Sequence, residues 1–196
     1  MKLSRGTLTV LSILLTLIVI YLFRNRSRLL PPGSLTTSTQ LELPTPGPTT
    51  PITGRPRVEI STSKGNFTVE LRPDLAPKTV TNFLSKWNSG YCDNLTFHRV
   101  EDWVVQGCDP AGDGTGGSTT LPTETSAENF AAGSLGVARK TVPADLSNDS
   151  QFFIVKKDSS FLNGQYTYFG RVISGMDIIN RLTAGDKIIA AAFLGK

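Results

Sequence analysis

The feature that most limits the fold of this chain is a series of short apolar runs, each interrupted after a few residues by Gly, Asn or Pro. In several of these runs β-branched or aromatic residues alternate with polar ones, a pattern typical of strands that bury one face. The runs lie at 57–62, 66–71, 96–100, 103–106, 133–138, 150–155, 161–172 and 187–195. Many short strands of this kind predict an all-β domain.

Only two segments have helical spacing. The apolar residues of the first recur at i, i+3, i+4 and i+7, as Val80, Phe83, Leu84 and Trp87. Pro77 fits the first helical position, and Gly90 can end the helix in a left-handed conformation. A second short helix is predicted at 176–183. Residues 118–132 and 139–150 are polar and weakly patterned, so we expect loops there.

The first 56 residues differ from the rest in composition and charge. Residues 1–56 carry a net charge of +5, and residues 57–196 carry −1. Because the folded part is nearly neutral, nucleic-acid binding loses the support that a basic chain would give it. Residues 6–23 contain no charge and reach the lower range of a membrane-spanning helix. We expect an uncleaved single-pass anchor over residues 1–30; the alternative is a cleaved secretory signal, but no small-x-small pattern follows.

Residues 31–56 hold seven of the twelve prolines, together with Thr, Ser and Gly. Such a segment cannot bury a core and is expected to be a disordered, extended linker. We expect a membrane protein with a cytoplasmic N-terminus and an extracytoplasmic domain at 57–196.

The two cysteines, Cys92 and Cys108, form no CxxC motif and predict no zinc site. We expect them unpaired, with a disulfide as the alternative in an oxidising compartment.

The stretch 96–117 contains the only His of the chain and its densest run of Gly. If 96–100 is a strand, Phe97 and Arg99 point to the same face, because side chains at i and i+2 share a face. A cation beside an aromatic ring is a plausible shape for a binding site. The rival interpretation of Arg99 is a surface ion pair with the neighbouring Glu101 or Asp102.

Five blocks, FHR, VVQG, GDGTGG, SQFFI and FGRV, occur in one order between residues 97 and 172. In these blocks the chain resembles cyclophilin-type peptidyl-prolyl cis-trans isomerases, over about residues 57–190. The resemblance implies a closed eight-stranded antiparallel barrel with a helix over each end. It also implies an enzyme that binds proline-containing segments of client proteins, assists their folding, and needs no metal or cofactor. We expect the protein to be a monomer.

The resemblance also assigns site residues. It implies that Arg99 and Gln106 are catalytic. The residues that it implies for substrate binding are Trp103, Val104, Ala138, Arg139, Phe153, Phe161, Leu162 and Tyr166. Phe97 is added to the substrate-binding residues because it is expected to share a strand face with Arg99. Val104 stands where the family often has Met. Three others depart from the usual pattern: Arg139 replaces a small polar residue, Phe161 a Trp, and Tyr166 a His. Since Phe152 and Phe153 are adjacent in a strand, only one of them can face the groove.

Two other functions compete with an active isomerase. The first is a catalytically weak, proline-binding adaptor or chaperone on the same fold, which the three departures favour. The second is a dinucleotide enzyme, because residues 112–117 match GxGxxG; that fingerprint needs a following helix, which the sequence does not predict.

His98 lacks a nucleophile beside it in sequence and is expected to be a hydrogen-bonded structural residue.

Overall fold

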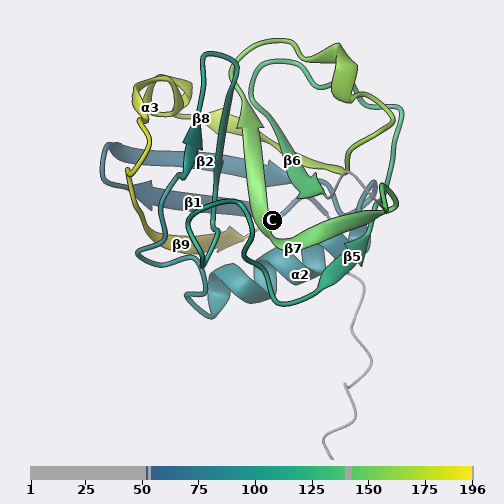
Figure 1. The fold of residues 1–196 in the computed structure, drawn as a ribbon, viewed down its shortest axis with the longest axis horizontal. Helices are drawn as coiled ribbons and strands as arrows, with labels where there is room; N and C mark the ends of the chain where they lie inside the picture. Colours follow the sequence, from purple (N-terminus) through teal and green to yellow (C-terminus); the bar gives the residue numbers. More distant parts are fainter. Residues whose placement is uncertain (1–51, 53, 140–142, 196) are drawn as a thin grey trace, which may run out of the picture. The chain divides into compact units, whose positions relative to one another are not determined.

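The computed structural model describes residues 52, 54–139 and 143–195. Nine strands form one antiparallel sheet (Figure 1). They are β1 Arg57–Thr62, β2 Gly65–Leu71, β3 Arg99–Val100, β4 Val104–Gly107, β5 Thr120–Pro122, β6 Ser134–Arg139, β7 Leu146–Val155, β8 Tyr168–Ser174 and β9 Ile188–Gly195. Their order is β3-β4-β7-β6-β8-β2-β1-β9, and β5 pairs with β7 outside this path. The all-β prediction is therefore confirmed.

Among the described residues two α-helices accompany the sheet, α2 over Pro77–Asn88 and α3 over Met176–Arg181, and Figure 1 shows them on different sides of it. Both were predicted. Pro77 begins α2, and Gly90 has the expected positive φ of 71° just beyond its end. A 3-10 turn, η2, covers Ser160–Leu162.

The sheet curls so that the two ends of its path approach each other. The end strands β3 and β9 are not paired directly within the described residues. Instead, Thr96 forms an isolated bridge with Lys187, and the Phe97 amide donates to the Asp186 carbonyl at 2.8 Å. The Ile188 amide likewise donates to the Leu95 carbonyl at 2.8 Å. The described residues thus form a curled antiparallel half-barrel of nine strands with two helices, which confirms the antiparallel, helix-flanked sheet but not the closed eight-stranded barrel that the resemblance implied.

The main core lies between one face of the sheet and α2. The predicted stripe of α2 is buried at Val80, Phe83 and Trp87. Phe83 stacks on Phe169 of β8 at 4.7 Å between ring centroids, and Trp87 meets Phe152 edge-on at 5.6 Å. Burial of each such aromatic ring contributes on the order of 2–3 kcal/mol, so this contact fixes α2 on the sheet.

A second, smaller apolar cluster lies outside this core, and its buried members are Val104, Phe130, Phe153, Val155, Leu162 and Tyr168. The ring of Phe153 crosses β6 at Gly136, where a Cβ atom would collide with it. Phe130 stacks against Phe153 at 5.8 Å between centroids. Phe152 and Phe153 thus face different clusters, as their adjacent positions in a strand require.

Three predictions about local structure were wrong. The segment 118–132, expected as a loop, contains β5, and β7 begins at Leu146 inside the second expected loop. The polar side chains there are used internally: Asn148 Oδ1 accepts from the Ser150 amide at 2.8 Å. Residues 161–167, expected to be the start of a strand, contain the end of η2, and β8 begins only at Tyr168.

The expectation of unpaired cysteines was also wrong. Cys92 and Cys108 form a disulfide across 5.0 Å between their Cα atoms, a separation within the usual range. Both residues are buried in the main core. The disulfide joins the segment after α2 to the residue that follows β4.

The predicted anchor and residues 31–51 of the predicted linker lie outside the described residues. Within the part of the chain that the structure describes, no helix is both long and apolar enough to cross a membrane.

Candidate active site

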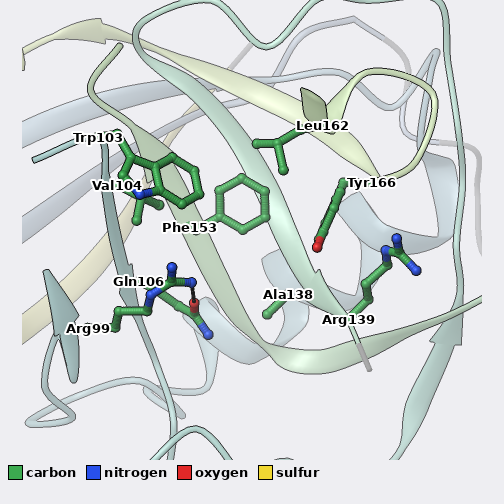
Figure 2. Close-up of a pocket in the computed structure, with 9 residues that line it drawn as sticks. All are labelled: Arg99, Trp103, Val104, Gln106, Ala138, Arg139, Phe153, Leu162 and Tyr166. Carbon is green, nitrogen blue, oxygen red and sulfur yellow. Dashed lines mark hydrogen bonds between the residues drawn. The ribbon is translucent and has the colours of Figure 1, made fainter. Parts of the chain in front are cut away.

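A cavity of about 200 Å³ opens on the sheet beside the smaller apolar cluster (Figure 2). Its walls are formed by Arg99, Trp103, Val104, Gln106, Ala138, Arg139, Phe153, Leu162 and Tyr166. All nine are residues that the sequence singled out. Their chemistry divides the cavity into an apolar part and a part with polar and cationic side chains.

Strand register brings the central residues together from distant parts of the chain. Arg99 of β3 lies opposite Gln106 of β4, and Gln106 lies opposite Phe153 of β7. Directly opposed residues in antiparallel strands project from the same face. One row across three strands therefore carries a cation, an amide and an aromatic ring.

The Arg99 side chain, which is 44% exposed, lies at the edge of the cavity. Its Nε donates to Glu101 Oε1 at 2.7 Å, and its Nη1 donates to Gln106 Oε1 at 3.4 Å. Glu101 Oε2 also accepts from Trp103 Nε1 at 2.7 Å. The hydrogen bond from Arg99, followed by that from Trp103, holds the pKa of Glu101 below its usual value. The predicted ion pair with Glu101 is therefore present, and it orients Arg99 at the cavity.

Gln106 is oriented by a buried residue that the sequence analysis missed. Gln106 Nε2 donates to Gln151 Oε1 at 2.9 Å. Gln151 is 1% exposed and donates to the carbonyls of Gly114 and Gly116 at 3.1 and 2.7 Å. A hydrogen-bond chain thus runs from Arg99 through both glutamines into the Gly-rich loop. The sequence feature that could have identified Gln151 is its polar side chain inside the apolar run SQFFIV.

The apolar part of the cavity is a cup of aromatic and aliphatic side chains. Phe153 and Leu162 are 5% and 3% exposed, so their packing holds them in place. Tyr166 meets Phe153 edge-on at 5.8 Å between centroids. In Figure 2, Trp103 lies on the opposite side of Phe153 from Tyr166. A cup of this size and character suits a small ring without hydrogen-bond donors, such as the pyrrolidine of proline.

Two predicted substrate-binding residues do not line the cavity. Phe97 is fully buried in the main core, so this prediction was wrong. Strand β3 begins only at Arg99, so the alternation assumed for 96–100 does not hold, and the Phe97 ring packs where Gly107 has no Cβ. Phe161 is 60% exposed and contacts the Trp103 ring from outside, at 5.2 Å between centroids.

Arg139 and Tyr166 form the far wall of the cavity. The Arg139 guanidinium lies 4.5 Å from the centroid of the Tyr166 ring. Its Nη1 makes a long hydrogen bond of 3.4 Å to the Ala144 carbonyl. Figure 2 shows the guanidinium beyond Tyr166, on the side away from Phe153.

His98 does not line the cavity. Neither ring nitrogen has a hydrogen-bond partner among the described residues, so the prediction of a hydrogen-bonded histidine was wrong. Burial is the main cause that lowers the pKa of His98, opposed in part by the charge of Asp109. Burial thus favours the neutral form of the ring, which is a packed, half-buried group.

The Gly-rich loop is not a dinucleotide site. The Asp109 carboxylate accepts hydrogen bonds from the amides of Ala111 and Gly114, which fixes the start of the loop. Gly114 has a φ of 91°, a conformation that favours glycine. The loop leads into strand β5, and the dinucleotide fingerprint requires a helix at that place. No group of three or more potential metal ligands occurs in residues 54–139 and 143–195.

The sequence was compared with known families and proteins. The profile of the family described as "Cyclophilin type peptidyl-prolyl cis-trans isomerase/CLD" matches residues 57–190. A "Probable peptidyl-prolyl cis-trans isomerase" from Brucella suis is 41% identical over 137 residues, which cover 63% of this chain and 69% of the relative. "Peptidyl-prolyl cis-trans isomerase CYP18-2" from Arabidopsis thaliana is also 41% identical, over 65% of this chain and 80% of the relative.

A comparison with solved structures gives the same family. The crystal structure of a cyclophilin-type peptidyl-prolyl cis-trans isomerase from Cryptosporidium parvum matches with a TM-score of 0.68 and 29% identity, over 73% of this chain and 99% of that one. The same protein, solved in the presence of the dipeptide Ala-Pro, matches with a TM-score of 0.66. This chain therefore belongs to the cyclophilin-type peptidyl-prolyl cis-trans isomerase family, and it is an enzyme that interconverts the cis and trans forms of X-Pro peptide bonds.

Proposed function

We propose that the cavity of Figure 2 is the active site, with Arg99 and Gln106 as its catalytic residues and the apolar cup as its proline pocket. The observation that carries this proposal is the register that places Arg99, Gln106 and Phe153 in one row. A related protein crystallised in the presence of Ala-Pro supports a proline-containing peptide as the ligand.

The reaction needs a donor more than a nucleophile. Amide resonance sets a rotation barrier of about 18–20 kcal/mol, and rotation disrupts that resonance and leaves a lone pair on the prolyl nitrogen. A hydrogen bond to this lone pair stabilises the twisted state and not the planar one. Each ~1.4 kcal/mol of such preferential stabilisation raises the rate tenfold.

Arg99 is prepared for this role. Nε and Nη1 are committed to Glu101 and Gln106, and Nη2 has no hydrogen-bond partner among the described residues. Arg99 can therefore donate from Nη2 to the prolyl nitrogen without giving up the bonds that orient it. Gln106, held by Gln151, offers its remaining amide hydrogen and oxygen to the peptide backbone. Preorganised donors avoid reorganisation during the reaction.

The test is an isomerisation assay by NMR line shape or protease coupling, with a short X-Pro peptide and the full chain in detergent. We expect Arg99→Ala to lower kcat/KM by about 100-fold, the usual effect of losing a preorganised donor. Arg181→Ala, an arginine of α3 outside the cavity, serves as the control and should retain activity. Equal activity of the Arg99 variant and the wild type would refute the assignment.

The second candidate is a proline-binding adaptor or chaperone role with weak turnover on the same fold, which the replacements at Arg139 and Tyr166 favour because both residues line the cavity. The same assay separates the two functions. An adaptor would bind the peptide, with a change in Trp103 fluorescence, while accelerating its isomerisation only weakly.

We further infer that the enzyme is a monomer tethered by residues 6–23, with its domain on the extracytoplasmic side, where it assists the folding of exported chains. The charge-free run at 6–23 and the proline-rich segment after it support a tether. The Cys92–Cys108 disulfide supports an oxidising compartment. Protease protection of the domain in sealed cells or vesicles tests the side, and light scattering in detergent tests the monomer. Cleavage of the domain by a protease confined to the cytoplasmic side would refute this orientation.

A further inference from the structure

The cavity carries an unbalanced positive charge at the end away from Arg99. Arg99 itself is neutralised by Glu101 at 2.7 Å. Arg139 forms no ion pair with any residue that the structure describes, and its one hydrogen bond is the long contact with the Ala144 carbonyl. No carboxylate lines the cavity. A peptide bound in the cup therefore lies near two arginines. The charge of Arg99 is paired with Glu101, and that of Arg139 is not paired with any described residue.

Tyr166 holds this second cation in a defined place. The guanidinium lies over the Tyr166 ring at 4.5 Å, a distance at which cation–π attraction is significant. The Nε atom of Arg139 is buried and has no acceptor within the described residues. The side chain is thus partly desolvated and stacked. Ordering it on binding costs less entropy than ordering a free surface arginine.

The position of Arg139 relative to the cup decides which part of a substrate it can reach. Arg139 follows Ala138 on β6, and Figure 2 shows its guanidinium beyond Tyr166, outside the cup itself. The proline ring, held between Trp103 and Tyr166, would not touch it. A side chain from a residue flanking the proline would.

We propose that Arg139, positioned by Tyr166, determines substrate specificity and favours an anionic side chain, carboxylate or phosphate, on a residue flanking the proline. This proposal rests on the assignment of the cavity as the active site. Arginine binds both anions through paired hydrogen bonds, and the partly buried position lessens the screening by salt.

The experiment compares peptides that differ at one flanking position, before or after the proline, with Glu, Gln or phosphoserine. The readout is the ratio of kcat/KM for the anionic peptide to that for the Gln peptide, measured on the full chain in detergent. For the preferred flanking position we expect a ratio of about five or more in the wild type at low salt, falling as salt is raised. A larger ratio for phosphoserine than for Glu identifies phosphate as the better ligand.

Substitutions test whether Arg139 causes the preference for the anionic peptide. In Arg139→Gln the ratio should fall to about one, whatever happens to the rates themselves, and in Arg139→Lys it should be partly retained because the charge remains. The matched control is Arg181→Gln, which removes the same charge from α3 and should leave the ratio unchanged. A wild-type ratio near one at both flanking positions, or a ratio that survives Arg139→Gln, overturns the proposal.

The failure of this proposal can be told apart from a failure of the active-site assignment. If Arg99→Ala retained full turnover, the catalytic assignment would fall, while the comparison of peptides would still measure discrimination. If turnover were too slow to measure, the dissociation constants of the same peptides, followed by tryptophan fluorescence, would give the ratio instead. Equal dissociation constants for the Glu, phosphoserine and Gln peptides would overturn the proposal in that case as well.

Discussion

At the scale of single residues, Glu101 decides how Arg99 and Trp103 are presented to a substrate. One carboxylate oxygen accepts from Arg99 and the other accepts from Trp103, both at 2.7 Å. This one side chain therefore fixes a donor and a wall of the proposed proline pocket relative to each other. Because Glu101 is exposed, it contributes more to the orientation of Arg99 and Trp103 than to the stability of the fold.

Glu101→Ala should consequently lower kcat/KM by about 3- to 10-fold without unfolding the protein. The Nε–H signal of Arg99 in the NMR spectrum should shift or broaden, because its acceptor is gone. The adjacent Asp102, whose carboxylate pairs with Lys157 at 2.7 Å, provides the control. If Asp102→Ala reduced activity as much as Glu101→Ala, orientation by Glu101 would not be the cause.

The half-buried ring of His98 makes folding sensitive to mild acid. Its pKa is lowered in the folded protein, mainly by burial, so the unfolded chain binds a proton at higher pH than the folded one. The stabilisation is present above the unfolded pKa of about 6.5 and is lost as pH falls below it.

We therefore expect the free energy of unfolding to decrease between pH 7.5 and pH 5.5, as measured by urea denaturation. His98 is the only histidine of the chain, so His98→Phe should remove most of this decrease. An unchanged slope in the variant would mean that carboxylates, and not His98, cause the pH dependence.

At the scale of elements, the disulfide ties two segments that flank the site. Cys108 follows β4, two residues after Gln106, and precedes Asp109, whose carboxylate fixes the Gly-rich loop. Cys92 lies in the segment between α2 and β3. The bond thus supports the loop whose carbonyls hold Gln151 in place.

Reduction of the disulfide should destabilise the protein by about 3 kcal/mol, the loop-closure contribution for a loop of this length. The measurement is urea unfolding with and without dithiothreitol. A Cys92→Ala/Cys108→Ala protein should be less stable than the oxidised wild type and indifferent to the reductant. Two free thiols in the wild type purified without reductant would contradict the pairing.

The sequence allowed the elements to be predicted better than the pairing between them. Periodicity alone located α2, because Val80, Phe83 and Trp87 form one buried stripe. Periodicity missed β5 and the first half of β7. Polar residues such as Asn148 form hydrogen bonds within this region, and a polar segment resembles a loop in sequence. Periodicity also misplaced Phe97, whose direction depends on a bridge between Thr96 and Lys187 that no local pattern encodes.

At the scale of the whole molecule, the resemblance of five short blocks identified nine cavity residues that periodicity could not have assembled. Their proximity depends on strand register between distant segments, such as Gln106 with Phe153. The cysteine pair escaped prediction for a similar reason, because composition gives no distance between Cys92 and Cys108.

The order of the sheet makes the last strand essential. β9 pairs with β1 along its length, so the two ends of the domain are neighbours in space. A chain that stops after Asp186 should fail to fold cooperatively, because β1 and α2 would lose their partner. Circular dichroism and thermal unfolding would show a loss of the cooperative transition. A truncated chain that still unfolds cooperatively would contradict this role of β9.

The same pairing sets a delay during synthesis. Strand β1 is made early, yet its outer edge waits for β9, which on a ribosome adding about 5–20 residues per second arrives on the order of 10 s later. In that interval an edge with the alternating residues Val58 and Ile60 is open to pairing with other chains. An isomerase whose last strand completes its sheet is thus exposed to incorrect strand pairing during its own synthesis, and β1 is the part most in need of protection.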